Sequence, residues 1–325
     1  MMDEVRWGII GCGDVTEVKS GPALQQALGS KLVAVMRRNR QLAEDFANRH
    51  QVPRWYDCAQ RLINDPDVNA IYVATPPSSH KEYVLAAANA GKPVYVEKPM
   101  GMDFTECEEM IQACENKSVP LFVAYYRRAL PRFLKVKSLL ESEAIGTPRL
   151  AEVTFYRPPS KQDFEGSENW RIDPAVAGGG YFHDLASHSI DLLQFLLGDA
   201  VRASGYSSNQ AGLYNAPDMV SGVMCLKTGI QVSFTWNFNA YRLFDQTEIV
   251  GENGLIRFST FEEAPVVLET DSGQEICEIP NPVHIQKPLI QTVVDKLTGK
   301  GNCHSTGKSA ARTNWVMDQM LLFSC

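Results

Sequence analysis

Residues 5–16 read VRWGIIGCGDVT, and this stretch decides the fold of the first half of the chain. Its apolar first half is typical of a buried strand, and the glycines follow that strand directly. Gly11 permits a tight turn, and Gly13 lets the backbone approach a phosphate without a Cβ in the way. The amides of Asp14 and Val15 then begin a helix, and a helix N-terminus attracts negative charge. At this position the pattern G-x-G-x-x-T predicts a pyrophosphate site, against the alternative of a simple glycine turn.

The rest of the first half repeats the same rhythm of apolar strands and helices. Further buried strands are predicted at residues 31–36, 70–74, 93–96 and 121–124, with helices at 15–28, 41–49, 79–90 and 103–116. The strands are apolar throughout, which is typical of a parallel sheet covered by helices on both faces. We therefore expect residues 1–124 to form an α/β Rossmann domain that binds its ligand at the carboxyl ends of the strands.

The pattern changes at residues 120–130. Strands of more alternating polarity are predicted at 150–156, 200–207, 219–226, 230–239, 244–250, 254–259 and 266–270, with helices at 131–143, 182–197, 284–298 and 306–323. Alternating strands joined by short turns are typical of an antiparallel sheet. Residues 125–325 are therefore expected to form an α+β domain with a large, mainly antiparallel, open-faced sheet.

The bulk properties exclude several classes of protein. The formal net charge is −7 and no long basic run is present, so nucleic acid is not an expected partner. No apolar run approaches the roughly 18–20 residues that span a bilayer, and the charged N-terminus does not resemble a signal peptide. We expect a cytoplasmic protein without a membrane segment. The eight cysteines form no C-x-x-C pair, so no metal site is expected.

The end of the second predicted strand bears on the choice of cofactor. Arg37 and Arg38 stand where a carboxylate usually holds the adenosine ribose. Guanidinium groups suit a 2′-phosphate through their charge and planar geometry, so NADP(H) is favoured over NAD(H). The alternative is that one or both arginines point to water. That alternative weighs more for Arg37 than for Arg38, which is also suited to stacking on adenine.

Four segments together resemble the Gfo/Idh/MocA oxidoreductases, the family of glucose–fructose oxidoreductase and inositol dehydrogenase. They are GIIGCG at 8–13, ATPPSSH at 74–80, EKP at 97–99, and the glycines at 178–180 followed by Asp184, His188 and Asp191. The segment NWR at 169–171 also looks like the sugar-converting members. The resemblance covers nearly the whole chain. It implies hydride transfer between nicotinamide and a CH–OH group of a sugar, a polyol or a related compound.

Two loops after predicted strands are expected to complete the cofactor site. The loop at Thr75 and Pro76 is rigid and short of backbone donors, so it suits a path under a dinucleotide, although alone it would be an ordinary turn. The resemblance implies that His80 lies near the cofactor, that Glu97 contacts or orients it, and that Lys98 is catalytic. A lysine at the mouth of the sheet can donate a hydrogen bond to a carbonyl oxygen or share a proton.

The helix predicted at 182–197 carries a candidate acid/base pair. Asp184 and His188 stand at i and i+4, so they share one face. Asp184 would orient the substrate or tune His188, which would exchange the proton. Taken singly, Asp184 is better explained as an N-cap and His188 as a core histidine, but together with Lys98 the catalytic role is favoured. Asp191 is equally compatible with a structural role.

Four further residues are candidates for contacting the substrate. Arg127 falls at the end of the last Rossmann strand, and Tyr156, Trp170 and Arg171 lie in the second domain. Aromatic faces suit the C–H surfaces of a sugar, and a guanidinium suits its hydroxyls. Trp170 is equally suited to packing between domains.

The prediction is therefore an NAD(P)-dependent dehydrogenase or reductase in which Lys98 and His188 handle the proton. One alternative is a glycosidase that uses bound NAD in a transient redox cycle, against which the two arginines argue mildly. Another is a non-enzymatic dinucleotide-binding regulator, which the presence of Lys98 and His188 disfavours. A homodimer or homotetramer through the second sheet is also expected, since residues 234, 236 and 238 place Phe, Trp and Phe on one side of that sheet, which needs cover.

Overall fold

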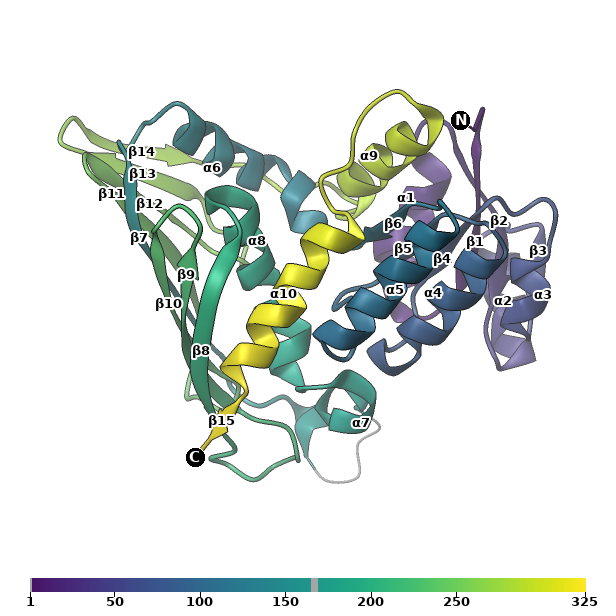
Figure 1. The fold of residues 1–325 in the computed structure, drawn as a ribbon, viewed down its shortest axis with the longest axis horizontal. Coiled ribbons are helices and arrows are strands. Elements are labelled where there is room, and N and C mark those ends of the chain that lie inside the picture. Colours follow the sequence, from purple (N-terminus) through teal and green to yellow (C-terminus); the bar gives the residue numbers. More distant parts are fainter. Residues whose placement is uncertain (1, 165–168) are drawn as a thin grey trace. The chain divides into compact units, whose positions relative to one another are not determined.

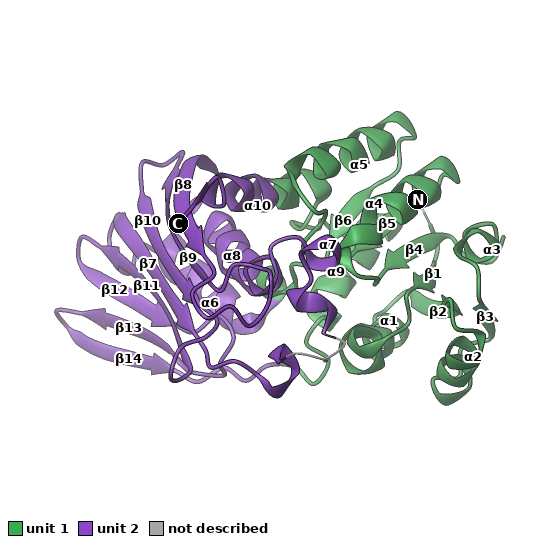
Figure 2. Ribbon diagram, turned by 90° about the horizontal axis from the view of Figure 1, so that it is seen from below, with its two compact units in different colours: residues 1–129, 282–311 green, residues 130–281, 312–325 purple. Residues whose placement is uncertain are grey.

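The computed structural model describes residues 2–164 and 169–325, and the chain divides into two compact units. Unit 1 comprises Met1–Ala129 and Pro282–Ala311, and unit 2 comprises Leu130–Asn281 and Arg312–Cys325 (Figure 2). The units are thus not two consecutive ranges of the chain. The second segment of unit 1 carries a helix that the sequence analysis assigned to the second domain.

Unit 1 is built on a six-stranded parallel sheet of the order β3-β2-β1-β4-β5-β6. Its strands are Val5–Ile10 (β1), Ser30–Met36 (β2), Arg54–Tyr56 (β3), Ala70–Val73 (β4), Val94–Val96 (β5) and Leu121–Val123 (β6). This arrangement confirms the predicted Rossmann fold. The strand order reverses between β1 and β4, and ligands of open parallel sheets bind at such a point.

Helices cover both faces of this sheet (Figure 1). They are the turn of π-helix Thr16–Ser20 (η1), Gly21–Gln26 (α1), Arg40–Arg49 (α2), Ala59–Ile63 (α3), Pro77–Ser79 (η2), His80–Asn89 (α4), Phe104–Asn116 (α5), Tyr126–Ala129 (η3), Lys287–Thr298 (α9) and the start of Gly307–Met320 (α10). Asp103 caps α5, since its carboxylate accepts the amide of Glu106 at 2.8 Å.

Helix α9 completes the core on one face of the unit 1 sheet. Its buried residues are Leu289, Ile290, Val293, Val294 and Leu297, and it packs against α1 and β1. Trp7, Tyr72 and Tyr95 are fully buried in the sheet, with Tyr72 and Tyr95 stacked at 5.0 Å between ring centroids. The Tyr95 hydroxyl donates to Gln286 Oε1 at 3.3 Å, just before α9 begins. The late segment of the chain is therefore part of this core.

Unit 2 is built on a nine-stranded sheet of the order β14-β13-β12-β11-β7-β10-β9-β8-β15. Its strands are Pro148–Tyr156 (β7), Ala200–Ser208 (β8), Met219–Leu226 (β9), Gln231–Asn237 (β10), Phe244–Gly251 (β11), Gly254–Phe258 (β12), Val266–Thr270 (β13), Gly273–Cys277 (β14) and Phe323–Ser324 (β15). The pairs β7–β10 and β8–β15 are parallel and the other pairs are antiparallel. The mainly antiparallel sheet predicted from the sequence is confirmed.

Helical segments of unit 2 complete its architecture. They are Pro131–Glu141 (α6), Lys161–Asp163 (η4), Trp170–Ile172 (η5), Pro174–Ala177 (α7), the π-helical turn Phe182–Ala186 (η6) and Ser187–Leu197 (α8). The aromatic side chains of Phe234, Trp236 and Phe238 are buried, and Phe182 packs edge-on against Trp236 at 5.2 Å. These three side chains are thus covered within the unit, so the argument that drew self-association from them was wrong. The opposite face of the sheet carries the partly exposed Val223.

Neither a membrane-spanning helix nor a metal-binding cluster is found in residues 2–164 and 169–325. No helix in these ranges is long and apolar enough to cross a membrane. No group of three or more His, Cys, Asp and Glu side chains within them is arranged to hold a metal ion.

The helix after the glycine loop is tied to α2 by an ion-pair cluster. Glu17 accepts hydrogen bonds from Arg49 Nη2 at 2.8 Å and contacts His50 Nε2 at 2.7 Å. Arg49 is the main reason why the pKa of Glu17 is lowered from 4.5 to about 2. A carboxylate with a lowered pKa stabilises the fold above its unfolded pKa, and this contribution is lost as the pH falls through the folded value.

We expect Glu17→Gln to lower the free energy of unfolding by about 1 kcal/mol at pH 7, as for other partly exposed ion pairs. The deficit should shrink as the pH falls from 4.5 towards 2, because the unchanged protein then protonates Glu17 as well. Urea unfolding measured across this range checks it, with Glu44→Gln on the exposed side of α2 as the control. A deficit that stays constant down to pH 2.5 would contradict the assignment.

Candidate functional site

The first glycine of the loop after β1 is required by the packing of unit 1 itself. Gly11 has a φ of +93°, and a Cβ there would lie 2.6 Å from Thr75 Cγ2 and 3.0 Å from the Thr75 backbone nitrogen. The amides of Gly11 and Cys12 donate to Met36 O at 2.9 and 3.1 Å. The loop is therefore wedged between the ends of β2 and β4, at the point where the strand order reverses.

The second glycine is not required by any contact within the protein. A Cβ on Gly13 would have its nearest neighbour, Gly11 O, 4.0 Å away. The carbonyl of Gly13 accepts Thr16 Oγ1 at 2.7 Å, so Thr16 takes the third position of the motif without opening the turn. The amides of Asp14 and Val15 begin the helix, where the first donors have no acceptor within the helix. This open space beside helix-terminal amides fits a pyrophosphate.

The arginines after β2 have different environments. Arg37 is half-buried and its Nη1 donates to Cys12 O in the glycine loop at 3.4 Å. Arg38 is exposed. Arg40, which the sequence analysis did not select, lies 5.2 Å from the centre of the Trp55 ring on β3. Of the two predicted arginines, it is thus Arg37 that is attached to the loop and Arg38 that faces solvent.

His80 joins two loops instead of pointing into open space. Its imidazole is fully buried, with Nε2 2.8 Å from Thr75 O and Nδ1 3.0 Å from Pro99 O. Burial lowers the pKa of His80. The residue therefore ties the loop at Thr75 and Pro76, after β4, to the segment that follows Lys98, after β5. Its effect on a bound cofactor would come through the position of these loops.

Glu97 is the centre of a buried polar network. Its Oε1 accepts the Tyr72 hydroxyl at 2.6 Å and Gln286 Nε2 at 2.8 Å, and its Oε2 accepts the amide of Lys98 at 3.2 Å. Glu97 is 7% exposed and Gln286 is 1% exposed. The backbone at Lys98 is thereby fixed at the carboxyl edge of the sheet, two strands from the glycine loop. Gln286 was missed because only the fold brings it here.

In unit 2 the structure brings together three of the predicted residues. Asp184 lies in the π-helical turn that leads into α8, and its Oδ2 is 3.3 Å from Arg171 Nε. The Arg171 guanidinium lies 4.6 Å from the centre of the Trp170 ring. His188, one turn further along, is 4% exposed, and its ring centroid is 6.1 Å from that of Phe261. No sequence signal pointed to Phe261.

Other residues near the predicted helix and on the sheet make contacts within unit 2 that account for them. The imidazole of His183 lies against Gly178, where a Cβ would come 2.9 Å from its Cδ2, so these glycines make room for it. Asp191 is 1% exposed and accepts Thr313 Oγ1 of α10 at 3.3 Å, which supports its structural role. Tyr156 stacks on Phe244 at 5.1 Å. It lies on the face of the sheet opposite to the buried Phe155, so the structure does not bring it to Asp184.

Arg127 lies in η3, at the end of the first segment of unit 1, and its guanidinium lies 4.9 Å from the centre of the Tyr126 ring. It is 6% exposed. The next residue, Arg128, donates from Nη1 to His304 O at 2.6 Å and to Ser309 Oγ at 2.9 Å. Arg128 therefore holds the second segment of unit 1 in place, and Arg127 stays a candidate for contacting the substrate.

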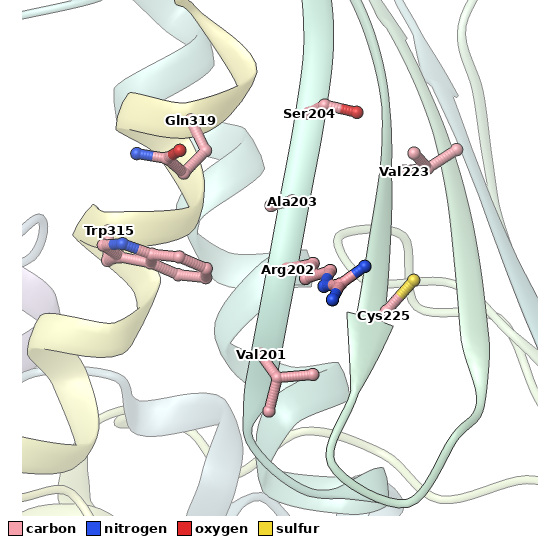
Figure 3. A pocket seen from close by; sticks show the side chains of 8 residues that line it. All are labelled: Val201, Arg202, Ala203, Ser204, Val223, Cys225, Trp315 and Gln319. Carbon is pink, nitrogen blue, oxygen red and sulfur yellow. The ribbon is translucent and has the colours of Figure 1, made fainter.

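A shallow pocket of about 420 Å³ lies elsewhere in unit 2 (Figure 3). It is lined by Val201, Arg202, Ala203 and Ser204 of β8, Val223 and Cys225 of β9, and Trp315 and Gln319 of α10. None of the predicted site residues contributes to it. The pocket is therefore not assigned to the candidate site.

Comparison with known proteins identifies the family. Residues 5–125 match the oxidoreductase family with an NAD-binding Rossmann fold, and residues 133–257 match the GFO/IDH/MocA C-terminal domain. The chain belongs to the Gfo/Idh/MocA oxidoreductases. The resemblance noted in the sequence is thus confirmed, and the chain is an NAD(P)-dependent oxidoreductase of this family.

Individual relatives extend over nearly the whole chain. The chain is 41% identical to Oxidoreductase P35 of Formosa agariphila over 98% of each protein. It is 31% identical to inositol 2-dehydrogenase of Acidothermus cellulolyticus, over 83% of this chain and 76% of the relative. Levoglucosan dehydrogenase in complex with NADH and levoglucosan has the same fold, with a TM-score of 0.88 over 98% of this chain and 96% of that one, at 22% identity.

The two glycines of the loop should respond differently to alanine. Gly11→Ala should destabilise the protein by at least about 1–3 kcal/mol, because a side chain at this φ is strained and its Cβ meets Thr75. Gly13→Ala should leave the melting temperature nearly unchanged and weaken dinucleotide binding, because the added methyl enters space that the protein leaves open. Calorimetry and NAD(P)H fluorescence titration measure both effects. Unchanged affinity in Gly13→Ala would argue against the assigned pyrophosphate position.

Proposed function

We propose that this protein transfers a hydride between a nicotinamide dinucleotide and the CH–OH or carbonyl carbon of a sugar, a polyol or a related compound. One observation carries the proposal. Lys98 follows the carboxyl end of β5, at the same edge of the sheet where the glycine loop follows β1, and the buried Glu97 holds the backbone of Lys98. Support for the substrate class comes from relatives named for inositol, levoglucosan and 1,5-anhydro-D-fructose, all polyhydroxylated rings.

The cofactor would be held by the loops of unit 1. Gly11 and Gly13 shape the turn, and the amides of Asp14 and Val15 face the pyrophosphate. The loop at Thr75 and Pro76 would run beneath the dinucleotide, where Gly11 already packs against Thr75. When bound, the nicotinamide supplies or accepts the hydride.

Arg37 and Arg38 would favour NADP(H) over NAD(H) in this proposal. Arg37 is fixed beside the glycine loop, and Arg38 is exposed and able to approach a 2′-phosphate. His80 and Glu97 would act by holding the loops that carry Thr75 and Lys98.

The protein's own groups would move the proton that accompanies the hydride. In the oxidising direction the hydroxyl loses its proton to His188 or Lys98 as the hydride leaves carbon, and in the reducing direction the proton returns to the oxygen. The guanidinium of Arg171 holds the Asp184 carboxylate one helical turn from His188, so Asp184 would orient a substrate hydroxyl. Arg127 and Trp170 would contact the remainder of the substrate.

The proposal assigns cofactor binding to residues 1–124, and substrate binding and self-association to residues 125–325 without the segment 282–311. Residues 282–311 then serve the first of these roles, because they complete the core of unit 1. For a homodimer or homotetramer, the proposed surface is the sheet face that carries Val223 and Tyr206, which are 51% and 61% exposed.

Lys98→Ala and His188→Ala should each reduce kcat by about 10²- to 10⁴-fold, the usual contribution of a general acid or base. Both variants should keep their affinity for the dinucleotide. The assay follows nicotinamide absorbance with a panel of sugars and polyols, and the exposed Lys117→Ala is the matched control. If both groups serve one proton, the double variant should be little slower than the slower single variant. Turnover that survives in both single variants would overturn the proposal.

Arg38→Gln should raise the KM for NADPH by about 10- to 100-fold, the effect of losing a hydrogen bond between charged groups. The KM for NADH should stay unchanged in the same variant, since NADH has no 2′-phosphate. Arg37→Gln should weaken both cofactors because Arg37 also contacts the glycine loop. Steady-state kinetics with both cofactors separates these outcomes. A preference of the unchanged protein for NADH would refute the role given to the arginines.

A further inference from the structure

The loop after β12, residues 259–263, is held by a carboxylate. Asp245 of β11 accepts the backbone amides of Thr260, Phe261 and Glu262 at 3.1, 2.6 and 2.9 Å. Three successive amides on one carboxylate fix the backbone of the loop firmly, because hydrogen bonds to an ionised acceptor are stronger than those between neutral groups.

The same loop is also held by a buried guanidinium. Arg132 of α6 donates from Nη1 to Glu262 O at 2.5 Å and from Nη2 to Thr260 O at 3.1 Å. Arg132 is only 3% exposed. Burying a charged group is costly unless its donors find acceptors, and here the acceptors are carbonyls of the loop. Asp245 and Arg132 together form what we call the loop clamp.

The loop clamp fixes the backbone at Phe261, whose half-buried side chain lies against two rings of unit 2. Its ring lies 4.8 Å from that of Phe155 on the covered face of the sheet. Its centroid is 6.1 Å from that of the His188 imidazole, with the planes at 76°. Because the carbonyls and amides on both sides of Phe261 are fixed, the ring has little freedom to move away from His188.

We propose that Phe261 is a positioning residue that sets the orientation of the His188 imidazole, and that Asp245 and Arg132 act through it. The inference rests on the proposed proton transfer by His188. An edge-to-face contact between two rings restricts rotation of the imidazole about its side-chain bonds. A proton-transferring ring must hold its geometry within a few tenths of an ångström of the reacting oxygen. Loss of the contact therefore slows the reaction without loosening the cofactor.

The test compares Phe261→Leu with Phe261→Tyr. We expect Phe261→Leu to lower kcat by about 10- to 100-fold, as for other small displacements of a reacting group, with a small change in KM. Phe261→Tyr keeps the ring and should restore most of kcat. Asp245→Asn should lower kcat in the same way, because it weakens the hold on the loop. The control is Phe195→Leu, a half-buried aromatic of α8 that packs on Lys137 at 4.9 Å.

Two outcomes separate this inference from the proposed function. If His188→Ala abolishes turnover but Phe261→Leu keeps its kcat, the positioning role is wrong and the proposed function stands. If His188→Ala keeps its turnover, His188 does not transfer the proton, and the inference fails together with this part of the proposed function. Adding Phe261→Leu to His188→Ala should cost nothing further in kcat when Phe261 acts through His188. A further loss equal to that of the single variant would also overturn the inference.

Discussion

The buried carboxylate of Glu97 is the interaction on which the architecture of unit 1 depends. It joins the end of β4 through Tyr72, the exit of β5 through the amide of Lys98, and the start of α9 through Gln286. A carboxylate with so little exposure needs every one of these partners, because a buried charge without hydrogen bonds is costly. The same network therefore places Lys98 and recruits a segment that lies almost two hundred residues further along the chain.

In unit 2 an ion pair holds a candidate site residue in place, as Glu97 does for Lys98 in unit 1. Arg171 holds Asp184 where a π-helical turn leads into α8, and turns of this kind are frequent at functional sites. His183 lies back over the glycines that precede the turn. Packing against His183 thus explains the glycines. Asp184 and His188 remain the candidates for orienting the substrate and transferring the proton.

Much of the fold was predictable because its signals are local. The buried strands of unit 1 carry continuous apolar runs, and the glycine loop is recognisable from its position after the first of them. The edge strand β3 has only three half-buried residues and offers no such pattern. The place of α9 in unit 1 depends on Tyr95 and Gln286, which meet only in the folded chain. For Tyr156 the signal was present, since the alternation with Phe155 already assigns the two side chains to opposite faces.

The candidate site was predictable to a similar degree. Motif spacing selected Lys98, Asp184 and His188 as candidates, but it did not distinguish residues that contact a cofactor from residues that hold loops in place. The polar atoms of His80 and Glu97 form hydrogen bonds to carbonyls and side chains of the protein. These bonds depend on which loops the fold brings side by side. No sequence motif marks Phe261, because the residues that fix its loop, Asp245 of β11 and Arg132 of α6, are distant from it in the sequence.

Because Pro282–Ala311 belongs to unit 1, the folding of this unit during synthesis has to wait for a late segment of the chain. A ribosome delivers the N-terminal strands first, yet α9, which packs against β1 and follows the Gln286 that bonds Tyr95, emerges only after strands β7 to β14 of unit 2. Until then the nascent Rossmann half exposes an aromatic face, the kind of surface that chaperones bind. Folding of the two halves is therefore coupled in time, and a fragment that stops at Ala129 lacks one wall of its own core.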